Sequence, residues 1–409
     1  MTWRWRLYVI TFVESVASIL LERGIYFLTT DRLAFGDAAN LWIALAFGVA
    51  YGVGALASHP IADRIGERRL LMASIVGLAV LHLLLAVWPT AWGIAVMFPA
   101  VALVTGLKWP VIESYVGAGL DERQTRHAFG RFNLTWSTAV PLTIGGAGLL
   151  TAYLPSWVFF AIVVPMHVAS LVLVRGVPDE PEHAPLEPTE AGSNGVEIEQ
   201  DEEVIDPSAA AAAGRWRLLW ASRWLLVGSY AMSFLITPLI PQILGQLGRG
   251  PATAGWVAAL LDVARVVAFI GMVVWGGWHG RAWPIVAGMV ALPVGVALVL
   301  FGGTIGAVVA GELLFGLAMG GVYTTALYYA MVAKKASVDA GGSHEALIGG
   351  GFAIGPAIGL IGLAMASPMG GPIAGMLVGL GPWVVAITLL AGAGLGGVWP
   401  RQSSSAVRG

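Results

Sequence analysis

The stretch that decides the fold is His59-Pro-Ile-Ala-Asp63-Arg64-Ile-Gly66-Glu-Arg68-Arg69. Apolar segments flank it at 40–58 and 70–88, each close to the roughly 20 residues that cross a bilayer as a helix. Gly66 permits a tight turn between them because it has no Cβ atom. A basic cluster in a short loop is typical of the cytoplasmic side of a membrane. The stretch therefore predicts a cytoplasmic turn between two membrane-spanning helices.

The composition of the whole chain agrees with a membrane protein. Of its 409 residues, 57% are hydrophobic and 11% are charged, whereas soluble domains carry roughly 25% charged residues. So few charges cannot cover the surface of a soluble enzyme. The chain has no Cys, which excludes disulfides and thiolate metal sites. We expect no cofactor, no metal and no nucleic-acid partner, and a lipid bilayer as the surroundings.

Hydropathy divides the chain into two groups of six apolar segments, separated by an acidic stretch. The stretch 176–215 has eleven acidic residues and no base before Arg215, so it predicts a disordered linker. The predicted units are an N-terminal six-helix bundle (1–175), the linker (176–215), a C-terminal six-helix bundle (216–400) and a tail (401–409). The predicted spans are 7–28, 40–58, 70–88, 91–116, 128–150, 156–174, 218–243, 254–275, 282–301, 305–332, 346–367 and 374–398.

The distribution of Lys and Arg tests this division, because both residues concentrate on the cytoplasmic side. With the N-terminus inside, 17 of the 22 Lys and Arg fall in cytoplasmic segments, two fall outside and three fall within spans. We therefore expect cytoplasmic termini and a cytoplasmic linker. We also expect a monomer in a bacterial inner membrane.

The two halves of the chain match each other without a gap at a shift of 215 residues. The shift places Trp5 on Trp220, Gly106 on Gly321 and Pro141 on Pro356. Many transporters are built from related halves, so the match predicts a parallel duplication.

The turn after the second span resembles the loop 2–3 signature of the major facilitator superfamily, G-x-x-x-D-[RK]-x-G-x-[RK]-[RK]. Asp63, Arg64, Gly66, Arg68 and Arg69 match in place, with His59 at the first Gly position. The resemblance implies an all-α fold of twelve transmembrane helices in two six-helix bundles. It also implies secondary active transport by alternating access, with this loop as a conformational latch and spans 1, 4, 7 and 10 around a central cavity.

Eight ionisable residues fall inside the predicted spans: Glu14, Glu22, Arg23, Lys108, Glu113, Asp262, Arg265 and Glu312. Each costs roughly 2.5 to 3.5 kcal/mol at a helix centre, so they should face protein or water. Glu14, Ser18, Glu22 and Tyr26 recur every four residues on one helix face, as do Thr105, Trp109 and Glu113. Both faces lie on spans that the resemblance assigns to the cavity.

A carboxylate in a partly dry cavity can bind and release a proton as access alternates. The candidates for proton coupling are, in order, Glu22, Glu113 and Glu14. The candidates for the substrate cavity are Ser18, Arg23, Tyr26, Lys108, Trp109, Asn133, Trp136, Ser233, Thr237, Tyr323, Thr324 and Tyr328.

Several of these residues have a simpler interpretation. Arg23 can snorkel to the lipid headgroups, and Asp262 and Arg265, three residues apart, can form a structural ion pair. Glu312 suits an interfacial position as well as a cavity. The alternative function is a transporter-like sensor or assembly component that has lost transport and docks partners through its acidic linker.

Overall fold

The computed structural model describes residues 3–120, 122–179, 207–334, 338–369 and 371–395. These residues form sixteen α-helices and one short 3₁₀ helix, and no strand occurs among them. The first half comprises α1 (Arg4–Glu22), α2 (Ile25–Arg32), α3 (Asp37–Ile65), α4 (Glu67–Val87), α5 (Ala91–Gly117), α6 (Glu122–Tyr153), α7 (Ser156–Ala161) and α8 (Val164–Val174). The second comprises α9 (Pro207–Ile236), α10 (Ile240–Gln246), α11 (Pro251–Ala258), α12 (Leu260–Val274), η1 (Gly276–Trp278), α13 (Trp283–Phe301), α14 (Ile305–Lys334), α15 (Val338–Ala366) and α16 (Pro372–Leu395).

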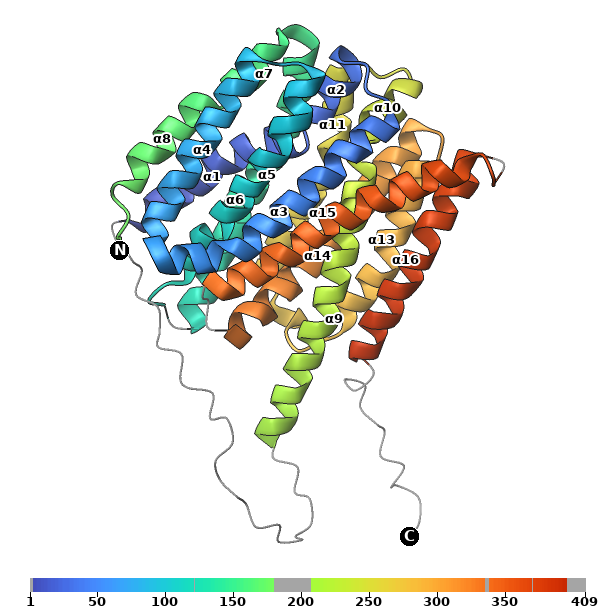
Figure 1. Cartoon of the computed structure of the whole chain (residues 1–409). Coiled ribbons are helices and arrows are strands. Elements are labelled where there is room, and N and C mark those ends of the chain that lie inside the picture. The colour runs from blue at the N-terminus through green and yellow to red at the C-terminus, as the bar shows by residue number, and fades with distance from the viewer. Residues whose placement is uncertain (1–2, 121, 180–206, 335–337, 370, 396–409) are drawn as a thin grey trace, which may run out of the picture.

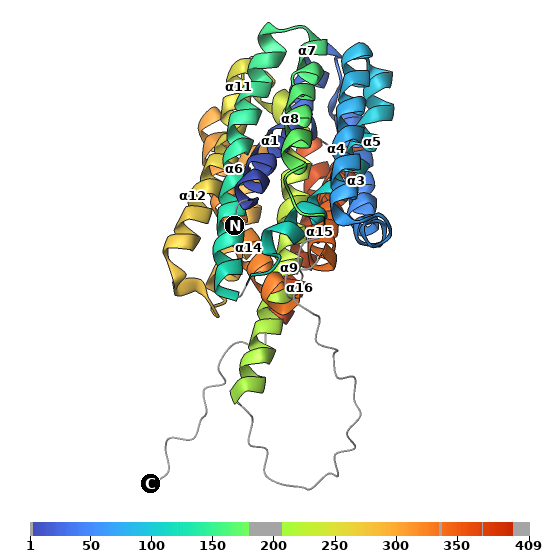
Figure 2. The same cartoon turned by 90° about the vertical axis from the view of Figure 1, so that its left-hand side faces the viewer.

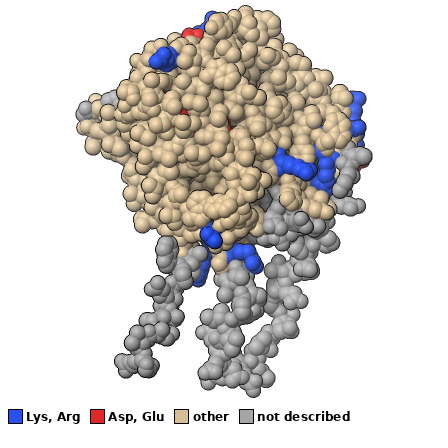
Figure 3. Space-filling model, turned by 180° about the vertical axis from the view of Figure 1, so that it is seen from behind, with Lys and Arg blue, Asp and Glu red and all other residues tan. Residues whose placement is uncertain are grey.

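Among the described residues, ten helical stretches are long and apolar enough to cross a membrane. The segments 4–32 and 122–153 fall outside this set: α1 carries two buried carboxylates, and α6 opens with a polar turn. Charged side chains avoid the middle of the surface. On the face seen in Figure 3, Lys and Arg lie toward the edges of the molecule, around a broad area in which acidic side chains show only as small spots. Such a surface suits a lipid environment.

Four predicted spans are interrupted rather than continuous. Span 7–28 divides into α1 and α2, 156–174 into α7 and α8, 218–243 into α9 and α10, and 254–275 into α11 and α12. Proline explains two of the breaks, because Pro165 and Pro241 lie in the first turn of α8 and α10 and have no backbone N–H to bond to the preceding turn.

The predicted end of the acidic linker is wrong. Helix α9 begins at Pro207, eight residues before Arg215, and includes the run Ala209–Ala213. Alanine has the highest intrinsic helix propensity, so this run extends the helix into the predicted linker. Residues 180–206 and the predicted tail 401–409 lie outside the described residues.

The helix boundaries repeat between the halves at the shift of 215 residues. Adding 215 to the bounds of α2 gives 240–247, against 240–246 for α10, and the bounds of α5 give 306–332, against 305–334 for α14. The break after α1, at Arg23 and Gly24, falls on 238–239, inside the break after α9. The two halves therefore share helix positions and an interruption of their first helix.

Two helices of the first half pack along helices of the second half. Helix α3 packs along α15, and α6 packs along α11 and α12 (Figures 1 and 2). Glycines bring the backbones close: a Cβ at Gly48 would lie 2.3 Å from the Phe352 backbone, and one at Gly148 would lie 2.3 Å from Pro251 O. Small residues permit such approaches between membrane helices. The functional site lies between the α3–α15 contact and the contact of α6 with α11 and α12.

Candidate functional site

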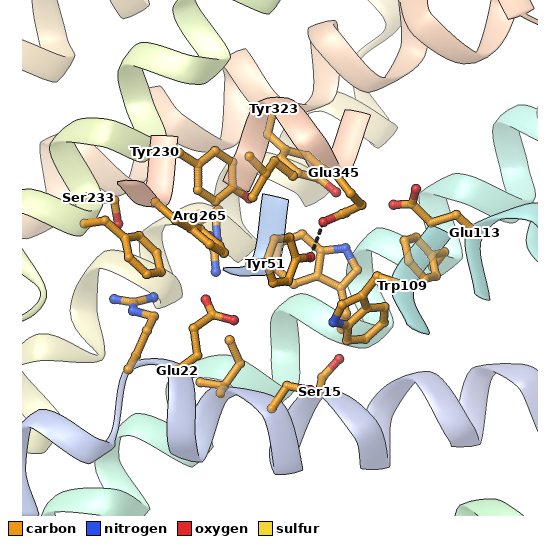
Figure 4. Close-up of a pocket in the computed structure, with 18 residues that line it drawn as sticks. Ser15, Glu22, Tyr51, Trp109, Glu113, Tyr230, Ser233, Arg265, Tyr323 and Glu345 are labelled. Carbon is orange, nitrogen blue, oxygen red and sulfur yellow. Dashed lines mark hydrogen bonds between the residues drawn. The ribbon is translucent and has the colours of Figure 1, made fainter. Parts of the chain in front are cut away.

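A cavity of about 80 Å³ lies between the two halves (Figure 4). Helices α1, α3, α5 and α6 line it from the first half, and α9, α12, α14 and α15 line it from the second. The structure brings together here eight of the residues predicted for proton coupling or for the substrate cavity: Glu22, Glu113, Ser18, Arg23, Trp109, Trp136, Ser233 and Tyr323.

Two carboxyl groups from opposite halves face each other at one side of the cavity. Glu113 lies on α5 and Glu345 on α15, and their carboxyl groups are adjacent (Figure 4). The Tyr51 hydroxyl, from α3, donates a hydrogen bond to Glu345 Oε2. All three side chains are buried. Two adjacent carboxylates repel each other when both are ionised. The pair can therefore hold one shared proton between the two halves.

An ion-pair cluster closes the opposite side of the cavity. Arg23 Nη1 lies 2.6 Å from Asp262 Oδ2, and Arg265 Nη2 lies 2.5 Å from Asp262 Oδ1. Arg23 is only 7% exposed, so the interpretation that it snorkels to headgroups is wrong. The predicted pair Asp262–Arg265 is present, but a third member from the other half shares the carboxylate. Both arginines bind Asp262, and among the residues that the structure describes no ion pair joins Glu22, Glu113 or Glu345 to a basic side chain.

Aromatic rings form much of the cavity wall. Phe234 stacks on Phe352 with ring centroids 3.8 Å apart, and Trp136 lies edge-on to Tyr323 at 5.4 Å. The Arg265 guanidinium sits over the Trp136 ring at 4.8 Å. Rings and carboxylates together suit a ligand with an apolar body and a polar or positively charged group.

Glu14 and Lys108 do not line the cavity, contrary to prediction. Lys108 Nζ lies 2.8 Å from Glu14 Oε2 and 3.0 Å from Ser18 Oγ, inside the first half. Both side chains are fully buried. The four-residue spacing predicted that Glu14 lies on the helix face that lines the cavity. In the structure its side chain lies toward α8, where it contacts His167.

Five other predicted cavity residues also lie away from the cavity. The Tyr26 ring packs edge-on against Phe98, and Asn133 accepts a hydrogen bond from Trp136 Nε1. The Thr324 hydroxyl donates a hydrogen bond to the carbonyl of Gly320 in its own helix, α14. Thr237 lines a second, smaller cavity, and Tyr328 packs against Trp278 and His279.

The second cavity lies beside the ion-pair cluster. Arg23 and Glu312 line it together with Thr237. Glu312 is 1% exposed, so the structure favours the cavity position over the interfacial one. Arg23 thus borders both cavities.

The loop predicted to act as a latch forms the turn between α3 and α4. Gly66 has φ of +89°, a conformation that L-residues with a Cβ rarely adopt. Arg68 forms an ion pair with Asp179, and its Nη1 donates to Val177 O at 3.1 Å. The loop therefore binds the segment that follows α8 in the same half. Asp63 is exposed, and Arg64 and Arg69 take no part in this contact.

Sequence reasoning missed Glu345, Tyr51 and Tyr230. The predicted span 346–367 begins one residue after Glu345, because the polar run Gly341-Gly-Ser-His-Glu345 lowers the local hydropathy. In the structure α15 begins at Val338 and carries Glu345 into the cavity. Tyr51 and Tyr230 give no such signal, since a single tyrosine in an apolar span more often packs than binds.

The helix order, the two halves and the central cavity can be compared with known proteins. The sequence model of the Major Facilitator Superfamily matches residues 11–237 of this chain. The chain belongs to the major facilitator superfamily. It is therefore an integral, multi-pass membrane transporter. No curated protein sequence matches the chain.

Solved structures show how this superfamily member resembles others in fold. Two crystal structures of a bacterial homologue of the human lysosomal transporter Spinster superpose on it. The inward-facing, unoccupied form matches with a TM-score of 0.64 at 14% identity, covering 97% of this chain and 96% of that one. The inward-facing, occupied form matches with a TM-score of 0.65 at 13% identity and the same coverage.

Proposed function

We propose that this protein is a secondary active transporter that moves a small organic solute across the membrane by alternating access and couples the movement to protons. The single observation that carries the proposal is the Glu113–Glu345 pair. Its two carboxyl groups come from opposite halves and meet in a cavity that both halves line. A proton held there joins the halves, and its loss leaves two repelling charges that favour their separation. Glu22, on the same cavity, is the next candidate for proton coupling.

The cavity favours a solute that is neutral or positively charged. Glu22, Glu113 and Glu345 line it, while Arg23 and Arg265 are both paired with Asp262. The aromatic wall adds an apolar surface. We propose an organic amine with an apolar body as the substrate class. In this proposal twelve helices span the membrane, and the termini are cytoplasmic.

Transport in proteoliposomes with an imposed pH gradient tests the proposal. Ethidium, a fluorescent aromatic cation, is the first probe, and a thermal-shift screen of amines and metabolites supplies others. We expect gradient-driven movement to fall about tenfold or more in Glu113→Gln and Glu345→Gln, because an amide cannot bind and release the proton as a carboxylate does.

Asp31→Asn is the matched control, because Asp31 is 40% exposed and lies far from the cavity lining. It should transport like the unmodified protein. If no probe moves, and the Glu113 and Glu345 variants change only the binding of a protein partner, the transporter-like sensor is the better description.

A further inference from the structure

Four buried ionisable side chains form a chain inside the first half, outside the central cavity. Lys108 Nζ lies 2.8 Å from Glu14 Oε2, and Glu14 Oε1 lies 3.0 Å from His167 Nδ1. His167 Nε2 in turn lies 3.3 Å from His82 Nδ1. Each of the four side chains is at most 1% exposed. They come from α1, α5, α8 and α4, so four helices converge on this chain.

The hydrogen bonds fix the direction of the chain. An ionised carboxylate only accepts, so His167 Nδ1–H donates to Glu14 and a neutral His167 accepts at Nε2. His82 Nδ1–H then points to His167 Nε2 and to Leu78 O, which lies 2.8 Å away. His82 Nε2 is left with a lone pair, and it is buried without a hydrogen-bond partner among the described residues. Buried polar atoms are normally satisfied, so an open acceptor at the end of the chain is unusual.

We propose that His82 and His167 form a proton-binding site that acts through Glu14 on Lys108 and the central cavity. A proton from water adds to His82 Nε2 and forms an N–H bond there. The N–H bond at His82 Nδ1 breaks as its proton passes to His167 Nε2. His82 is again neutral, and His167 carries the single added charge as an imidazolium.

The added charge changes the balance around Glu14. Before protonation, the Glu14 carboxylate and the Lys108 ammonium form a neutral pair. Afterwards one carboxylate lies between two cations, which weakens its hold on Lys108. Lys108 Nζ already lies 3.0 Å from Ser18 Oγ and 4.9 Å from the Trp109 ring centroid, and both residues line the cavity. Protonation therefore favours displacement of the ammonium toward the cavity wall.

Few other charges act on the site. The charged groups nearest His82 along this chain are His167, Glu14 and Lys108. Helices α3 and α7 also pack against α4. Helix α7 has no titratable side chain. Those of α3 are Tyr51, which lines the central cavity, and four that lie in its first or its last two turns: Asp37, His59, Asp63 and Arg64. The response of the pair therefore reports on Glu14 and Lys108.

Nitrogen NMR of the reconstituted full-length protein, labelled with ¹⁵N in its histidine rings, tests the proposal. His82→Gln and His167→Gln assign the two signals, and the exposed His127→Gln is the control. On lowering the pH from about 9 to about 4, we expect the His167 ring to become an imidazolium. Glu14→Gln should lower the midpoint by about one pH unit or more, and Lys108→Met should raise it by a similar amount.

Two results would overturn the proposal: a His82–His167 pair that stays neutral down to pH 4, or a midpoint that is the same in Glu14→Gln. Asn replaces Gln at either histidine if a variant does not fold, as judged by its melting temperature. The inference rests on the proposed proton coupling, but the titration needs no transport. A pair that titrates without solute movement contradicts the proposed function alone, and normal transport with an inert pair contradicts this inference alone.

Discussion

Asp262 links the two halves through a buried ion pair with Arg23. It is completely buried and binds Arg23 from the end of α1 and Arg265 from its own helix, α12. One carboxylate thus compensates two guanidinium groups. A buried charge that loses its partner is costly, because neither water nor another ion replaces the partner. Loss of the Asp262 carboxylate should therefore destabilise the protein more than loss of either arginine.

We expect Asp262→Asn to lower the free energy of unfolding by about 3 to 5 kcal/mol, since it leaves two buried guanidinium groups unpaired. Arg23→Gln should cost less, about 1 to 3 kcal/mol, because Arg265 still binds Asp262. Denaturant unfolding of the purified protein in detergent measures both. Asp31→Asn is the control: its pair with Arg32 is half-exposed and worth at most ~1 kcal/mol. Equal losses in all three variants would contradict this ranking.

At the residue scale, the sequence predicted part of the site. Buried charges such as Glu22, Glu113 and Arg23 stand out in apolar spans, and all three line the cavity. Their partners did not stand out. Glu14 and His167 are 153 residues apart in the chain, and no spacing rule links positions on helices that meet only after folding. The same holds for Glu113 and Glu345.

At the element scale, hydropathy predicted where apolar segments lie but not where they break. The break at Arg23 and Gly24 has no proline. It occurs where Arg23 reaches Asp262 of the other half and where a Cβ at Gly24 would lie 2.7 Å from the Ala147 Cβ. Both contacts form only in the folded protein, so a hydropathy profile along the sequence cannot predict them. The turn at Gly66 is different, because its cause is local.

We expect Gly66→Ala to lower the free energy of unfolding by about 1 to 2 kcal/mol, because alanine is disfavoured at positive φ. Gly36→Ala is the matched control. Both glycines precede a helix, and a Cβ at either meets no atom within 4 Å, but the φ of Gly36 is −81°. Unfolding in detergent compares the two variants. If both lose the same stability, the backbone conformation of Gly66 is not the cause.

At the scale of the whole molecule, the halves meet along α3 and α15 from one end of the bundle to the other. A Cβ at Gly342 would lie 3.2 Å from Ala55 O, and one at Gly359 would lie 2.7 Å from the Leu41 side chain. Residues 41 and 55 are fourteen positions apart on α3, so these contacts lie about 21 Å apart along the helix. Alternating access requires each contact to open in turn.

The chain has no Cys, so introduced cysteines form the only disulfides. We expect the pairs Ala55→Cys with Gly342→Cys, and Leu41→Cys with Gly359→Cys, each to abolish transport on oxidation, because each disulfide holds one end closed. Reduction should restore it. Gly77→Cys with Val104→Cys is the control: a Cβ at Gly77 would lie 3.5 Å from the Val104 side chain, and both residues belong to the first half. A disulfide there should leave transport unchanged, since rocking moves each half as one body. Full transport by either variant after its α3–α15 disulfide has formed would show that the contact between α3 and α15 does not open during transport.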